Sequence, residues 1–138
     1  MALLFYIVVK FVAYVVWCAY GWYLLHKCAA GYGTAVRLGG LRWLMGVGFG
    51  VLIFLFLPTD AQGSDLIAVY VAVYTPVRIL EWTIMGGIIS ARRLRLTPRA
   101  GLLNAVWWVG GGVGLSFLTD IASPAGLQGM FCVGRCLC

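Results

Sequence analysis

Charged residues are scarce in this chain. They make up 10% of its 138 residues, whereas an ordinary soluble domain contains about a quarter. Because disordered chains are polar and strongly charged, this scarcity excludes disorder. Hydrophobic residues make up 63% of the chain, and a soluble fold of this size could not keep so much apolar surface away from water. The composition therefore predicts a membrane protein.

Acidic residues and histidine are scarcer still, with four Asp and Glu residues in all and His26 as the single histidine. One histidine excludes a haem held by two histidines of the same chain, and it excludes a histidine-rich metal centre. The sequence also lacks serine-hydrolase, phosphate-loop, paired-carboxylate and zinc-binding motifs. We therefore expect no catalytic residues, no metal and no cofactor other than bound lipid.

Long apolar runs are what the chain has instead. There are four of them, at residues 2–25, 38–57, 66–90 and 101–119. A helix needs about 20 apolar residues to cross a hydrocarbon core of about 30 Å, whereas barrel strands are shorter and alternate in polarity. Short loops join the runs, so we expect an all-α integral membrane protein. Its four transmembrane helices would form one domain, an antiparallel up-and-down bundle followed by a short tail at 120–138.

Basic residues concentrate around the first and third loops. They are His26, Lys27, Arg37 and Arg42 (just inside the second run), followed by Arg92, Arg93, Arg95 and Arg99. The second loop contains Asp60 and Asp65 and no base. Because Lys and Arg are retained on the cytoplasmic side, both termini are predicted to face outward, in a multi-pass protein of a bacterial-type inner or plasma membrane. Bases at helix ends rather than on one face argue against nucleic-acid binding.

The third run carries an unusual set of polar residues. Tyr70, Tyr74, Arg78, Glu81 and Met85 are spaced to lie on one stripe of a helix. Arg78 is expected near the middle of the bilayer, where a lone charge costs at least about 2.5–3.5 kcal/mol. Glu81 lies one turn further on and can pair with it.

Two other runs offer partners at compatible depths, Lys10 in the first and Asn104 in the fourth. The candidate intramembrane site therefore consists of Lys10, Tyr74, Arg78, Glu81 and Asn104. One interpretation is a polar clasp that fixes the third helix in the bundle or against another subunit. The other is a functional site for an anion, for a lipid or quinone head group, or for a proton relay through Glu81.

Glycine is abundant, with 19 residues, and two pairs have G-x-x-x-G spacing: Gly46 with Gly50, and Gly110 with Gly114. Both pairs lie inside apolar runs, so neither is a nucleotide-binding loop. Such pairs let helix backbones approach closely in lipid. They predict tight packing within one bundle or association between copies, with a water or ion path along bare backbone as a third alternative.

Three of the five cysteines lie in the tail, at Cys132, Cys136 and Cys138. An outward-facing tail is in a compartment that permits disulfides, and Cys132 with Cys136 is the preferred internal pair. An inert tail, lipidation and metal binding are the alternatives, although the tail does not supply a fourth metal ligand.

These features favour a non-catalytic integral membrane subunit that packs, with its glycine-rich and aromatic surface, against other membrane protein subunits in a larger complex. A small homo-oligomeric transporter or channel, using Arg78, Glu81 and Lys10, is the first alternative. A subunit that binds a quinone or a lipid head group beside Tyr74, Arg78 and Trp107 is the second.

Overall fold

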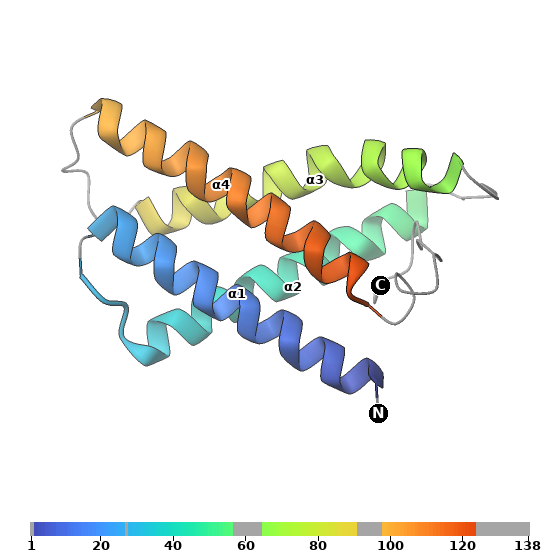
Figure 1. Ribbon diagram of the computed structural model, residues 1–138, viewed down its shortest axis with the longest axis horizontal. Coiled ribbons are helices and arrows are strands. Elements are labelled where there is room, and N and C mark those ends of the chain that lie inside the picture. The colour runs from blue at the N-terminus through green and yellow to red at the C-terminus, as the bar shows by residue number, and fades with distance from the viewer. Residues whose placement is uncertain (1, 27, 57–64, 91–97, 124–138) are drawn as a thin grey trace.

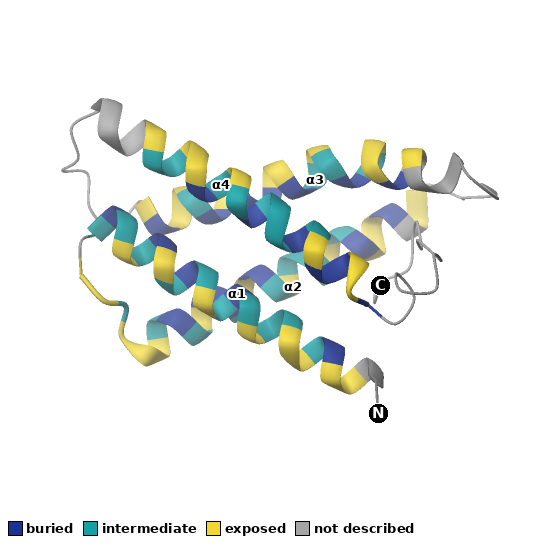
Figure 2. Cartoon of the chain, in the orientation of Figure 1, coloured by how far each residue is buried: buried dark blue, intermediate teal, exposed yellow. Residues whose placement is uncertain are grey.

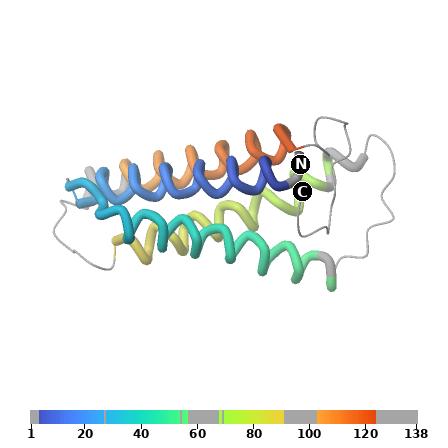
Figure 3. The backbone as a smooth tube through the Cα atoms, turned by 90° about the horizontal axis from the view of Figure 1, so that it is seen from below, coloured from blue at the N-terminus to red at the C-terminus, as the bar shows by residue number. Residues whose placement is uncertain are grey.

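Four long helices account for nearly all of the described chain. The computed structural model describes residues 2–26, 28–56, 65–90 and 98–123. The helices are α1 (Ala2–His26), α2 (Tyr32–Phe56), α3 (Asp65–Ser90) and α4 (Pro98–Ile121). Successive helices run in opposite directions, so the start of α1 and the end of α4 lie at the same end of the molecule (Figures 1 and 3). The all-α, four-helix, up-and-down bundle predicted from the sequence is confirmed.

The helix boundaries differ from the sequence-based prediction by no more than three residues, except at the start of the second helix, where the difference is larger. The second helix begins at Tyr32 rather than at residue 38, and its first turn is secured by Gly31, whose carbonyl oxygen accepts from the N–H groups of Thr34 and Ala35 at 2.9 and 3.0 Å. Hydropathy marks the apolar part of a helix and leaves out polar first turns. The difference matters because it moves Arg42 from the edge of α2 to its interior.

Membrane spanning is supported only in part. Two stretches within the described residues are long and apolar enough to cross a bilayer, Leu4–His26 of α1 and Tyr32–Ile53 of α2. Length and apolarity are weak indicators on their own, because the core helix of a soluble protein can have both. The four-span topology and the outward-facing termini therefore stay predictions.

The interior consists of two apolar clusters with charged side chains between them. The larger cluster comprises Tyr14, Cys18, Leu25, Leu38, Trp82, Met85, Ile89 and Trp108. The smaller one, toward the end where α4 finishes, comprises Ile53, Tyr70 and Tyr74. Each of the four helices also turns a stripe of exposed side chains outward (Figure 2).

Tryptophan side chains pack directly onto glycines where α1 meets α4. Trp17 donates from Nε1 to the carbonyl oxygen of Trp108 at 3.2 Å, and Trp108 donates back to that of Trp17 at 3.0 Å. A Cβ atom added at Gly21 would lie 2.3 Å from the Trp108 indole, and one at Gly111 would lie 2.4 Å from the Trp17 indole. Only glycine leaves room for this reciprocal arrangement.

The two glycine pairs singled out from the sequence lie in different surroundings. A Cβ atom at Gly110 or Gly114 would meet nothing within 4 Å, so these residues do not provide the close packing expected within one bundle. Neighbouring helices lie against other faces of α4, where indole rings cover Gly111 and Gly112. Packing of Gly110 and Gly114 between copies stays a prediction. Of the other pair, Gly50 is buried and Gly46 faces the charged side chains described below. The tail cysteines Cys132 and Cys136 lie outside the described residues.

Candidate functional site: a buried charge network

Five charged side chains, from all four helices, meet inside the bundle. We call them the charge network: Lys10 from α1, Arg42 from α2, Arg78 and Glu81 from α3, and Asp120 from α4. The stripe predicted on α3 is what brings α3 into this network, because Tyr70, Tyr74, Arg78, Glu81 and Met85 are all buried.

Glu81 binds two arginines. Its Oε2 atom lies 2.7 Å from Nη2 of Arg42 and 3.1 Å from Nη1 of Arg78. Arg42 and Glu81 are completely buried, and interactions between charges are strongest where water is excluded. The intrahelical Arg78–Glu81 pair expected from the sequence is therefore present, but it is one half of a bridge to α2.

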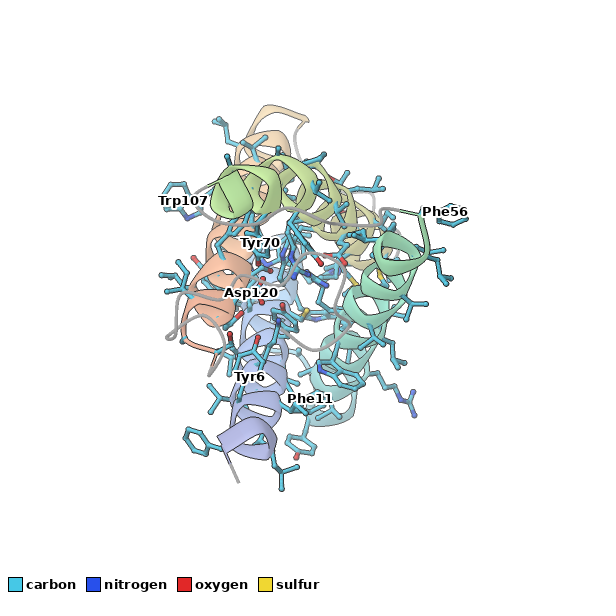
Figure 4. All side chains as sticks on the ribbon, turned by 90° about the vertical axis from the view of Figure 1, so that its right-hand side faces the viewer. Tyr6, Phe11, Phe56, Tyr70, Trp107 and Asp120 are labelled. Carbon is cyan, nitrogen blue, oxygen red and sulfur yellow. The ribbon has the colours of Figure 1, made fainter. Side chains whose placement is uncertain are left out.

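Asp120 collects hydrogen bonds at the other side of Arg78. Its Oδ2 atom accepts from Arg78 Nη2 at 3.0 Å and from the Tyr70 hydroxyl at 2.6 Å. Its Oδ1 atom accepts from Lys10 and, at 3.3 Å, from the Tyr6 hydroxyl. Tyr6, Tyr70 and Asp120 all point into the bundle, whereas Trp107 and Phe56 project from its outer side (Figure 4).

Aromatic rings surround the cations. The Arg42 guanidinium carbon lies 4.8 Å from the ring centre of Tyr14 and 4.7 Å from that of Trp82. Arg78 and Lys10 have similar contacts with Tyr74 and Tyr6, at 5.6 and 5.3 Å. These cation–π contacts stabilise desolvated positive charge. The aromatic rings therefore add to the stabilisation that the two carboxylates give the three cations.

The structure brings most of the predicted site residues together, but with partners other than those expected. Lys10 pairs with Asp120, and Tyr74 covers Arg78. Asn104, expected to reach Glu81, makes no hydrogen bond to it among the described residues. The glutamate is held by Arg42 instead. Trp107, considered for a head-group pocket with Arg78, is 72% exposed and faces away from the interior.

Sequence reasoning missed Arg42 and Asp120. Arg42 was interpreted as a topology marker beside the first loop, which is wrong because its side chain is fully buried and ion-paired. The available signal was spacing: Arg42 lies four residues before Gly46 and eight before Gly50, on one stripe. Asp120 likewise continues the spacing of Trp108, Gly112 and Ser116 on α4, all directed inward.

Ser116 connects the network to the larger apolar cluster. Its hydroxyl oxygen lies 3.0 Å from Trp82 Nε1 and 3.4 Å from Arg42 Nη2, and it donates to the carbonyl oxygen of Gly112 at 3.0 Å. A Cβ atom at Gly112 would lie 2.5 Å from the Trp82 ring. The buried polar side chains therefore end at the tightly packed Trp82, and the fully buried side chains described beyond it are apolar.

Several polar atoms of the network remain without a hydrogen-bond partner among the described residues. They are Nε and Nη1 of Arg42, Nε of Arg78, Oε1 of Glu81 and the hydroxyl of the neighbouring Tyr14. Four of these five atoms are donors. The network as a whole contains three cations and two carboxylates, so it has an excess of both donors and positive charge.

The chemistry that this arrangement supports is electrostatic. Among the described residues, no group of three or more His, Cys, Asp or Glu side chains could hold a metal ion. Both carboxylates are engaged by cations from other helices, which suits them to hold helices together.

Comparisons with protein-family models, with curated proteins and with solved structures find no match to this chain.

Proposed function

We propose that this chain is a small, non-catalytic integral membrane subunit that assembles with other membrane protein subunits. The observation that carries the proposal is the polarity of the bundle, which is reversed relative to a water-soluble one. Five charged side chains gather inside. Large apolar side chains are exposed on every helix, for example Phe5, Phe56, Ile79 and Trp107, which are 72%, 77%, 47% and 72% exposed. Exposed apolar surface on this scale favours contact with lipid or with other proteins.

The charge network fits this environment. Charged groups inside membrane bundles face the interior and pair with one another. Here the carboxylates and cations of four helices satisfy much of one another's charge, so the bundle does not depend on a neighbouring subunit for that purpose. This supports the clasp interpretation, with the clasp inside one chain.

A groove on the outer face between α3 and α4 is a surface suited to another subunit. Its volume is about 510 Å³, and it is lined by Ile79, Thr83, Ala105, Val106, Val109, Gly110 and Val113. Small residues allow close approach of a second helix in lipid. We therefore place an apolar transmembrane helix of a partner subunit there, against Gly110.

The transporter and head-group alternatives find less support. The polar interior stops at Trp82 rather than crossing the bundle, so transport would require a second arrangement of the helices. Trp107 lies apart from Arg78 on the outer surface, so the head-group site first considered is not assembled.

Membrane insertion and assembly are tested separately. The tagged chain is expected to stay in the membrane pellet after alkaline carbonate extraction and to be released by mild detergent. After release, it should purify with other proteins at fixed stoichiometry. Gly110→Ile should fill the groove and abolish that association. Gly48→Ile is the matched control, because Gly48 also has open space around it but lies on α2.

Recovery of the wild-type chain only as a monomer or homo-oligomer would contradict the subunit role. Equal retention of partners by both glycine variants would refute the placement of the partner helix. Release by carbonate would contradict membrane insertion itself.

A further inference from the structure

We propose that the interior of the bundle binds one small monovalent anion, such as chloride, beside Arg42. The ligands would be the unpartnered donors of Arg42, Arg78 and Tyr14. This site goes beyond the proposed subunit role and does not depend on it, because it rests on the interior of a single chain.

The first argument is charge. Three cations and two carboxylates face one another in the charge network, which leaves one positive charge in excess among the described interior side chains. Arginine does not deprotonate in proteins, and the ion pair with Asp120 favours the ammonium form of Lys10, so the three cations keep their charge. An uncompensated charge away from water is costly. One monovalent anion would neutralise the network.

The second argument is hydrogen bonding. Nε and Nη1 of Arg42, Nε of Arg78 and the hydroxyl of Tyr14 are buried and find no acceptor among the described residues. Buried donors are almost always satisfied in proteins, by protein, water or ligand. Among the described residues, the unpartnered atom that can only accept is Oε1 of Glu81, against three arginine N–H donors and the Tyr14 hydroxyl, which can donate as well as accept. The missing component is therefore an acceptor, and an anion is the strongest one.

The third argument is the absence of a side chain at Gly46, beside the charged groups. Gly46 presents a bare backbone to them: a Cβ atom there would lie 3.3 Å from Arg42 Nη1, 3.6 Å from Arg78 Nη1 and 3.9 Å from Glu81 Oε1. The Arg42 guanidinium also lies over the ring of Tyr14. The anion would lie next to the two arginines, on the side away from Glu81 Oε1, which repels it.

Access restricts the size of the anion. Arg42 and Glu81 are fully buried, and the network is most open at Lys10, whose side chain is 12% exposed. A lipid phosphate carries bulky substituents that such an opening does not admit. A free inorganic anion is therefore favoured over an acidic lipid head group.

Thermal unfolding of the full chain in neutral detergent tests the site. Chloride replaces gluconate at constant ionic strength, and tryptophan fluorescence gives the melting temperature. A ligand that binds only the folded state raises the melting temperature with concentration, so chloride should stabilise the wild-type chain. Tyr14→Phe removes one donor and should shift the half-maximal chloride concentration upward by roughly tenfold or more. Tyr23→Phe, an exposed position on the same helix, should leave it unchanged.

A second pair of variants approaches the site from α2. Gly46→Ala places a methyl group against the charged heads and should weaken chloride stabilisation, whereas Gly48→Ala, with open space around it, should not. Melting temperatures without chloride verify that all four variants fold.

Three results would overturn the proposal. The first is a wild-type melting temperature that does not respond to chloride or nitrate, which would leave water as the partner of the buried donors. The second is an identical chloride response in Tyr14→Phe and Tyr23→Phe, which would place the anion elsewhere. The third is stabilisation by phosphatidylglycerol with no response to chloride, which would assign the effect to acidic lipid.

Discussion

Replacing Asp120 with Asn should be among the most destabilising single substitutions in this protein. The Asp120 carboxylate accepts from Tyr6, Lys10, Tyr70 and Arg78. Asparagine has nearly the same shape, but it is neutral and turns an NH₂ group toward donors. The interior would then contain three cations and one carboxylate. Breaking a buried ion pair by removing one partner costs about 3–5 kcal/mol, and we expect a loss of that size in the free energy of unfolding.

A second substitution separates the loss of charge from the loss of shape. Lys10→Met in the Asp120→Asn background removes one of the two cations whose ion pair with Asp120 is lost. If the ionic contact explains the effect, the double variant should be more stable than the sum of the two single losses predicts. Contacting residues typically show such coupling at about 0.5–3 kcal/mol.

The assay is unfolding in mixed micelles at rising fractions of a denaturing detergent, followed by far-ultraviolet circular dichroism. Arg37→Gln serves as the control, because it removes a charge from an exposed position of α2. A cost for Asp120→Asn no greater than that for Arg37→Gln, or strictly additive losses in the double variant, would refute the account of the network as a mutual ionic clasp.

Three further predictions concern other parts of the bundle. Arg42→Met should lower the free energy of unfolding by about 3–5 kcal/mol, measured in the same assay, because Glu81 would keep only its contact with Arg78; an effect like that of Arg37→Met would contradict this. Gly111→Ala should destabilise the chain by about 1–3 kcal/mol through overpacking against Trp17, whereas Gly48→Ala should be neutral or slightly stabilising. In a chain whose tail cysteines are replaced by serine, a maleimide reagent should modify exposed Cys28 and leave buried Cys18 unmodified until denaturation; modification of both at equal rates would contradict the packing of α1.

The parts of the structure that follow from local sequence patterns were predictable. Apolar runs of suitable length predicted four helices, and spacing on the third run identified Arg78, Glu81 and the tyrosines as one buried stripe. The second partner of Glu81, Arg42, was not predictable by the same logic. Hydropathy began the second helix at residue 38, which left Arg42 at its edge, where a base is ordinarily a topology signal. The partnership of Asp120 with Lys10 depends on how four helices pack, which no single run of sequence contains.

The distribution of the network over the helices explains how a glycine-rich bundle can have a defined arrangement. In lipid, apolar side chains gain little by packing against each other rather than against acyl chains, so helices are ordered by close packing and by polar contacts. Here α3 contributes a cation and a carboxylate, and each of its neighbours contributes the opposite charge: Arg42 from α2 to Glu81, and Asp120 from α4 to Arg78. Lys10 then fixes α1 to α4. Rotating any one helix would separate its charge from its partner, so the network specifies the orientation of every helix as well as stabilising the whole.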